Sequence, residues 1–141
     1  MTDIRIIGSE GEKIGHIIKC YVDNTLIITE RINKTSLPIL TFDAEPPFST
    51  GRILLMPDTP IAIPESRVAV SYGMSSRCTV TLSSIGDTSI LALQRKLTTV
   101  SGNILEPQEI RISNPHKLSQ YGLMACDAAL LILGVSPDKL A

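Results

Sequence analysis

The chain has 141 residues, which is the length of a single domain and leaves no room for separate cofactor and substrate lobes. Hydrophobic residues make up 43% of the sequence and charged residues 19%, a balance that excludes a disordered chain and predicts a buried core. The net charge of -1 and the absence of tryptophan provide neither a basic surface nor aromatic stacking platforms, so we expect no nucleic-acid and no membrane partner.

We also expect no signal peptide. The start, residues 1–5, lacks the charged and apolar regions of a signal peptide, which predicts a cytoplasmic protein. The longest apolar stretch, residues 121–135, contains Asp127 and is shorter than the roughly 20 residues of a membrane span. It is typical of a buried helix.

The first half of the sequence consists of short apolar segments. Strands are predicted at residues 4–7, 25–29, 37–42, 52–56 and 67–72, and a helix at residues 14–22, where apolar side chains recur at helical spacing. Uninterrupted apolar strands of this kind suit a sheet that is buried on both faces.

The second half has a different pattern. Residues 78–84 alternate, residues 89–97 are apolar and then basic, and residues 97–100 and 104–112 are joined by Ser-Gly-Asn, which predicts an antiparallel hairpin. Asn114-Pro115 predicts a helix that begins at Pro115 and runs to Leu133. The small residues of this helix, Ala125, Ala128 and Ala129, favour close packing on the sheet.

Three cysteines lie far apart in the sequence. Cys20, Cys78 and Cys126 form no Cys-x-x-Cys pair and are odd in number, so we expect free, largely buried thiols. His16 and Cys20 are four residues apart on the first predicted helix, which could supply half of a metal site, but no further ligand is identifiable. No metal site is predicted.

A glycine-rich loop, Gly8-Ser9-Glu10-Gly11-Glu12-Lys13, joins the first strand to the first helix. Backbone N–H groups at such a helix start can hold an anion, and a lysine adds positive charge. However, Glu12 separates the last glycine from Lys13, and the two glutamates would repel phosphate. We favour an ordinary strand-to-helix turn; the alternative is an anion site made by Gly8, Ser9, Glu10, Gly11 and Lys13.

Three other polar residues have positions of possible interest. Asp43 and Glu45 follow a predicted strand, where carboxylates could hold magnesium beside a phosphate loop, although a solvated turn is the favoured interpretation. His116 lies in the first turn of the last predicted helix, where the helix dipole disfavours its charged form. It is more typical of a surface residue than of a catalytic base. No motif of a catalytic triad or metalloprotease is present, so no catalytic residue is predicted.

Taken in order, several segments resemble the central ATP-binding domain of the Mur ligases, the family that joins amino acids to UDP-muramoyl precursors. Residues 4–13 look like its opening strand and G-T-N-G-K-T loop, and residues 52–60 look like its strand ending in N-A-D-D-P. Residues 68–73 look like its strand ending in Y-G, and residues 114–138 like its late helix, which ends in L-G. The resemblance adds Asp58 to Asp43, Glu45 and His116 as candidates at the edge of a cleft.

The resemblance implies a reduced α/β sheet of the P-loop-like or Rossmann-like kind, with an antiparallel β-hairpin extension and a C-terminal helix. It also implies where chemistry is missing, because Ile14 replaces the magnesium-binding hydroxyl and Met56 the asparagine that contacts adenine. Lys117 and Gly122 break the H-N-x-x-N pattern of the late helix, and the region between Glu30 and Arg52 is too short to contain the family's magnesium-holding lysine and histidine.

These departures fall on the groups that would polarise the transferring γ-phosphoryl group. We therefore expect a non-catalytic Mur-ligase-like module without a cofactor, which acts in protein interaction or regulation by self-association or with another protein chain. One alternative is a protein that binds a small ligand such as an anion or a nucleotide. A second alternative is a subunit of an ATP-dependent ligase.

Overall fold

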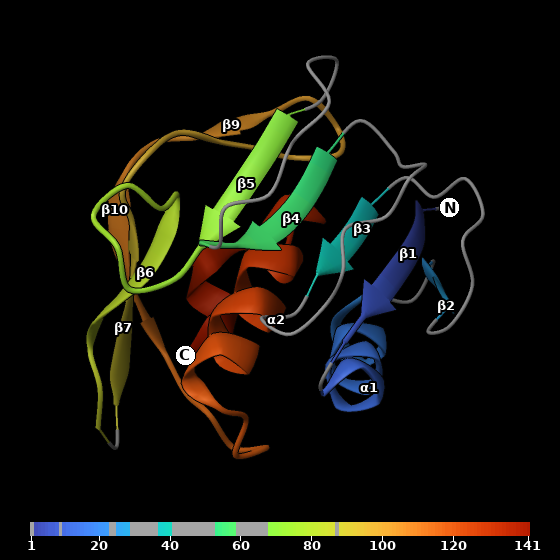
Figure 1. Ribbon diagram of the computed structural model, residues 1–141, viewed down its shortest axis with the longest axis horizontal. Helices are drawn as coiled ribbons and strands as arrows, with labels where there is room; N and C mark the ends of the chain where they lie inside the picture. Colours follow the sequence, from blue (N-terminus) through green and yellow to red (C-terminus); the bar gives the residue numbers. More distant parts are fainter. Residues whose placement is uncertain are drawn as a thin grey trace.

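The computed structural model describes residues 2–8, 10–22, 25–28, 37–40, 53–58, 68–86 and 88–141, which adopt a mixed α/β fold (Figure 1). The strands are β1 (Thr2–Ile7), β2 (Thr25–Ile28), β3 (Leu37–Leu40), β4 (Ile53–Pro57), β5 (Val68–Tyr72), β6 (Val80–Ser84), β7 (Ser89–Leu93), β8 (Leu97–Thr98), β9 (Ile104–Leu105) and β10 (Gln108–Ile112). The helices are α1 (Gly11–Tyr21), α2 (Gln120–Ile132) and the short 3-10 helix η1 (Pro137–Leu140).

Within the described residues, eight strands form one sheet in the order β10-β7-β6-β5-β4-β3-β1-β2, and β8 pairs with β9 in a separate hairpin. Strands β1 to β6 run parallel to one another, whereas β7 pairs antiparallel with β6 and with β10. This arrangement confirms the prediction of an α/β sheet with an antiparallel hairpin extension. No helix in the described ranges is long and apolar enough to cross a membrane.

The parallel part of the sheet meets the antiparallel part between β5 and β6. Backbone pairing there is limited to Tyr72 and Val80. Side-chain hydroxyls replace part of the missing ladder, because the backbone N–H of Thr79 donates to Ser71 Oγ at 3.1 Å. The side chain of Gln94 then ties the following loop to β7 by donating to the carbonyl of Cys78 at 2.9 Å. These bonds fix the loop that follows β5.

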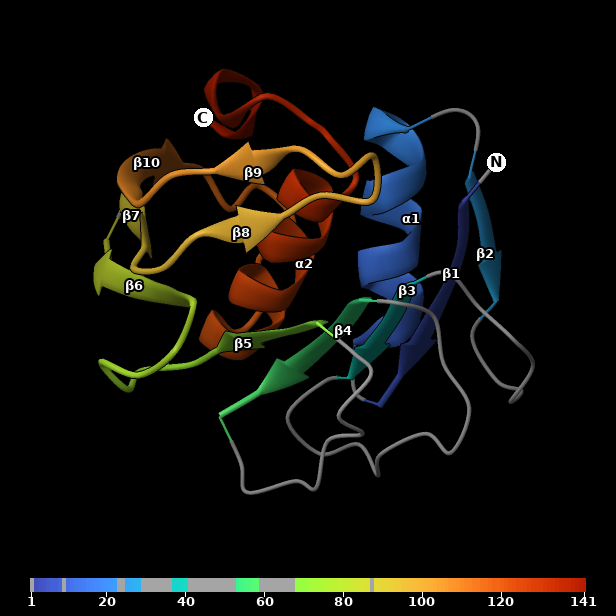
Figure 2. The same ribbon diagram turned by 90° about the horizontal axis from the view of Figure 1, so that it is seen from above.

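Helix α2 lies at the centre of the molecule, with the curved sheet around one side of it and the β8–β9 hairpin across the other (Figure 2). The hairpin is joined to the end of the helix, since the N–H of Val100 donates to the carbonyl of Ile132 at 2.8 Å. Helix α1 packs beside α2. Because α2 is covered on all these sides, every residue from Gly122 to Ile132 is buried.

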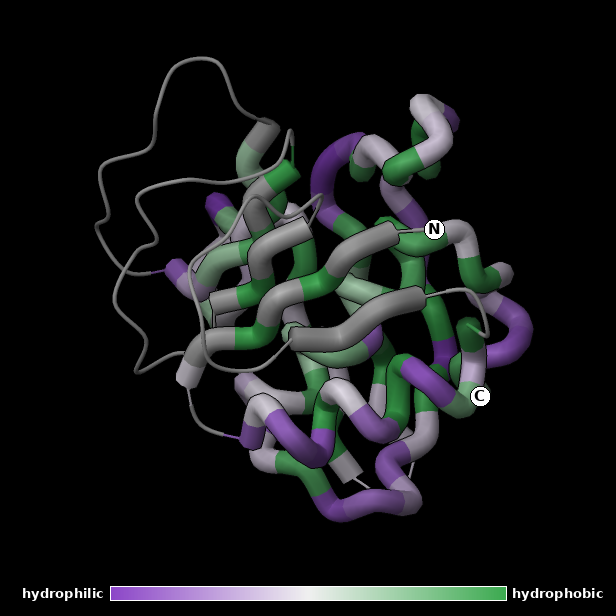
Figure 3. Tube along the Cα trace, turned by 90° about the vertical axis from the view of Figure 1, so that its right-hand side faces the viewer, coloured by the Kyte–Doolittle hydropathy of each residue, from purple (hydrophilic) through white to green (hydrophobic). Residues whose placement is uncertain are grey.

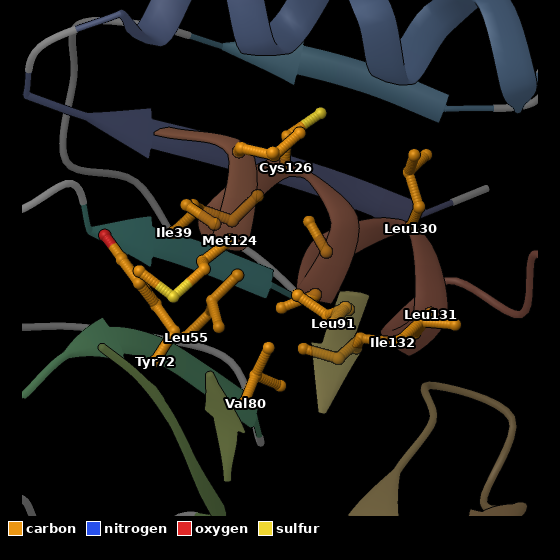
Figure 4. Packing of buried hydrophobic residues seen from close by; sticks show 14 of the residues in the cluster. Ile39, Leu55, Tyr72, Val80, Leu91, Met124, Cys126, Leu130, Leu131 and Ile132 are labelled. Carbon is orange, nitrogen blue, oxygen red and sulfur yellow. The ribbon is translucent and has the colours of Figure 1, made fainter. Parts of the chain in front are cut away.

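The core lies mainly between α2 and the sheet. Met124 lies among Ile39, Leu55 and Tyr72, and Leu131 and Ile132 lie near Leu91 (Figure 4). Hydrophobic segments occupy the interior and hydrophilic ones the outer turns (Figure 3).

The three alanines of α2 confirm the prediction of close packing. Ala125, Ala128 and Ala129 are all fully buried, so the backbone of the helix lies close to its neighbours.

The start of α2 differs from the prediction, because the helix begins at Gln120 and not at Pro115. The side chain of Asn114 closes a turn instead, accepting from the N–H of Leu118 and donating to its carbonyl, both at 2.9 Å. Ser119 is the actual N-cap, and its Oγ accepts from the N–H of Gly122 at 3.0 Å. Local side-chain bonding therefore outcompetes the helix signal of Asn-Pro.

The cysteines follow the prediction only in part. Cys78 and Cys126 are buried, but Cys20 is exposed on α1, so the expectation of a buried thiol was wrong there. His16 is exposed as well. The described residues contain no group of three or more histidine, cysteine or acidic side chains that could hold a metal ion.

Candidate functional site at the carboxyl edge of the sheet

The carboxyl ends of the parallel strands meet at one edge of the sheet, which is where open α/β sheets bind ligands. Gly8 follows β1, Asp58 follows β4, and Gly73 follows β5. Helix α2 begins at the same edge, because residues of its first turn contact Glu10 and Asp58. Two groups of polar residues lie here, one around Glu10 and one around Asp58.

The first group is built on Glu10, at the start of α1. Its backbone adopts the left-handed conformation, with φ 62° and ψ 11°, and its side chain does not cap its own helix. Instead, its carboxylate accepts from the backbone N–H of Ser119 at 3.1 Å and from the hydroxyl of Ser119. Glu10 therefore places a negative charge at the N-terminus of α2, where backbone amides and the helix dipole favour an anion.

Two glycines make the close approaches in this region possible. A Cβ atom at Gly122 would overlap the carboxylate of Glu10, so a side chain at this position would displace that carboxylate from its place beside Ser119. A Cβ atom at Gly11 would lie 3.2 Å from Cγ2 of Ile6, so glycine allows α1 to pack closely on β1. Both glycines serve packing.

Two other residues of the predicted loop are exposed. Gly8 is exposed with a φ of 110°, and Lys13 is exposed in the first turn of α1. Ser9 lies outside the described residues, as do Asp43 and Glu45 from the predicted cleft edge. The loop is best described as a strand-to-helix turn whose acidic side chain reaches across to α2.

His116 is exposed in the turn before α2, not in the first turn of a helix as the sequence predicted. The hydrogen bonds of the described residues do not connect it to Glu10 or to Asp58.

The second group joins Asp58 at the end of β4 to Tyr121 in α2. Burial raises the pKa of the Tyr121 phenol, and the Asp58 charge and the hydrogen bond to that carboxylate raise it further. Burial also raises the pKa of the Cys78 thiol, with a smaller contribution from Asp58. The chemistry available is therefore a carboxylate beside two neutral groups, a phenol and a thiol.

Sequence reasoning missed Tyr121 and Ser119. Each bonds to a residue far away along the chain, and Ser119 is 109 residues from Glu10. A serine before an apolar helix is a recognisable N-cap signal, but Asn114-Pro115 offered the same signal earlier in the sequence. No spacing pattern relates Tyr121 to Asp58.

One ionisable group is buried away from this edge. Asp127 lies in the middle of α2, is 6% exposed, and has an oxygen, Oδ2, without a hydrogen-bond partner in the described structure. Burial raises the pKa of its carboxyl to about 7. Burial and the charge of Asp127 both raise the pKa of Cys126, which is therefore an unreactive thiol.

Comparison with models of protein families gave no match for this sequence. No curated protein and no solved structure matched it either. The relationship to Mur ligases therefore stays a prediction from the motifs, and the geometry of the carboxyl edge is the guide to function.

Proposed function

We propose that the protein is a non-catalytic, Mur-ligase-like module that acts by binding protein, either a second copy of itself or another chain. The observation that carries the proposal is the position of Glu10, whose carboxylate occupies the N-terminus of α2 at the carboxyl edge of the sheet. A helix N-terminus at this edge is a natural site for a phosphate group. Here the chain's own carboxylate is bound there, and its charge repels phosphate.

The order of the strands supports this interpretation. Strands β2-β1-β3-β4-β5 follow the order of flavodoxin-like doubly wound sheets, in which ligands bind at the switch point between β1 and β3. The loop that contains Gly8 and Glu10 follows β1, which places a negative charge next to that point. This order favours a Rossmann-like relationship, and the charge favours the loss of nucleotide binding.

The two alternatives receive less support from the same residues. Phosphoryl transfer needs positive charge on the transferring group, yet Lys13 is exposed and separated from the last glycine by Glu12. The described carboxyl edge instead shows the carboxylates of Glu10 and Asp58. Anion binding and ligase chemistry would both require positive charge at this edge in place of the two carboxylates.

Sedimentation velocity of the purified chain through the micromolar range tests the proposal. We expect concentration-dependent self-association in sedimentation, or else capture of one defined partner chain. We also expect the purified chain to release no ADP from Mg-ATP and a muramoyl acceptor. Steady ADP release that is abolished by Lys13→Ala would contradict the non-catalytic role. The same variant serves as a control for contaminating ATPases.

A further inference from the structure

Strand β10 forms one edge of the large sheet, beyond β7 and β6 (Figure 2). Among the strands that the structure describes, it pairs with β7 alone. Ile110 and Ile112 are 4% and 1% exposed, so their side chains face the core. Glu109 and Arg111 are exposed, and because side chains alternate along a strand, both lie on the outer face of the sheet.

The backbone groups of these two charged residues point away from β7. Gln94, one residue after β7, donates its N–H to the carbonyl of Thr79 at 2.8 Å, on the β6 side. Backbone groups alternate between the two sides of a strand, so Leu91, three residues earlier, points toward β10, where its partner is Ile110. The residues on either side of Ile110 therefore direct their N–H and C=O groups to the outer edge of the sheet.

The two ends of this edge are closed to further pairing. The N–H of Ser113, one residue after the strand, donates to the carbonyl of Leu140 at 3.1 Å, so η1 covers that end. Pro107, one residue before the strand, has no N–H to donate. A further strand would therefore pair with residues 108–112, which are centred on Ile110. Such edges are where a sheet accepts a strand from another chain.

We propose that β10 pairs antiparallel with β10 of a second copy of the chain, across a two-fold axis at Ile110. This inference rests on the proposed self-association and names its interface. In this register each Glu109 lies opposite an Arg111, with both side chains on the outer face and both backbones directed at each other. Centring the pair on Glu109 or on Arg111 would instead place like charges opposite each other. The charges of the strand are therefore complementary to a second copy in one register.

Sedimentation equilibrium of charge-reversal variants at constant ionic strength tests this interface. Glu109→Arg would place arginines opposite each other, and Arg111→Glu would place glutamates opposite each other. We expect each substitution to weaken the homodimer at least about tenfold, because both symmetric pairs become repulsive. Glu12→Arg makes the same change of charge at an exposed position of α1 and should not alter dimerisation.

Two further samples restore the complementary charges. The variant that combines Glu109→Arg with Arg111→Glu exchanges the charges within each pair, and it should dimerise within about threefold of the original protein. An equal mixture of the two single variants should form a mixed dimer. Amide hydrogen exchange gives an independent readout, since the N–H groups of Glu109 and Arg111 should exchange more slowly in the dimer, where they are hydrogen-bonded.

Two kinds of result would overturn this interface. If the original chain stays monomeric throughout the micromolar range, β10 does not pair with itself, whereas capture of another chain would still support the proposed function. If the original chain dimerises but the single reversals do not weaken it, or the double variant does not recover, self-association uses a different surface.

Discussion

Glu10 is unusual because a residue with a side chain adopts the left-handed backbone conformation, which costs about 1–2 kcal/mol for residues other than glycine. The conformation turns the chain from β1 into α1, and the carboxylate then reaches Ser119 across the interface between the two helices. Charge-assisted bonds at a helix N-terminus offset a cost of this size. A single acidic residue thus connects the first helix to the last.

This connection predicts the behaviour of two variants. Glu10→Gln should lower the free energy of unfolding by about 1 kcal/mol, because the amide keeps the shape of the side chain but loses the charge at the start of α2. Gly122→Ala should displace the same carboxylate. Chemical denaturation of the single and double variants measures the coupling, and we expect the two losses not to add.

Glu12→Gln provides the matched control, because Glu12 is an exposed glutamate in the first turn of α1. It should change stability by only a few tenths of a kcal/mol. Equal losses of stability in Glu10→Gln and Glu12→Gln would show that Glu10 does not stabilise the start of α2. Additive losses in the variant that combines Glu10→Gln with Gly122→Ala would show the same.

Asp127 predicts how stability depends on pH. Its folded-state pKa of about 7 lies above the ordinary aspartate value of about 3.9, so the folded protein retains a proton that the unfolded chain releases. The contribution of Asp127 to the free energy of unfolding is therefore highest below about pH 4, and it falls as the pH rises to about 7. Between pH 5.5 and 8 we expect a loss of about 2 kcal/mol in denaturation experiments.

Two variants separate this effect from other titrations. Asp127→Asn should remove most of the loss, because the amide does not ionise. Asp138→Asn should leave the loss unchanged, since Asp138 is exposed in η1. A pH profile that is the same with and without the carboxyl group at residue 127 would be incompatible with a buried proton there.

Among the elements, the apolar strands were the easiest to predict from the sequence. Each predicted strand of the parallel part overlaps an observed one, because an uninterrupted apolar run of this length can be buried on both faces. The turn around Gly102 was equally clear, since Ser-Gly-Asn favours a tight turn, but only residues 104–105 of the predicted second arm pair with β8, and residues 108–112 pair with β7 instead. The start of α2 was wrong because side-chain bonds of Asn114 decide it, and periodicity does not show them.

The close packing of α2 predicts that a larger side chain in this helix lowers stability. Ala128 is fully buried, so Ala128→Leu should overpack the core and lower the free energy of unfolding by about 1 to 3 kcal/mol. Ser136→Leu, at an exposed position after the helix, is a control for added hydrophobic volume alone. A denaturation midpoint that Ala128→Leu leaves unchanged would mean that α2 is not packed closely on its neighbours.

At the scale of the whole molecule, the class of fold could be predicted but the arrangement around the candidate site could not. The sequence indicates a glycine loop beside a strand end, and in the structure these residues form the turn between β1 and α1. The contacts at this edge, from Glu10 to Ser119 and from Asp58 to Tyr121, join residues that are far apart in the chain. They depend on where α2 packs, and no local pattern of residues determines that.

Titration of the full chain with Mg-ATP, followed at the backbone amides of Gly8, Glu10, Gly11 and Ser119, tests the central claim most directly. If the carboxylate of Glu10 occupies the anion position, these amides should show no saturable shift at millimolar nucleotide. Saturable shifts at the same amides, lost on Gly11→Val, would contradict the account and identify the protein as a nucleotide-binding one.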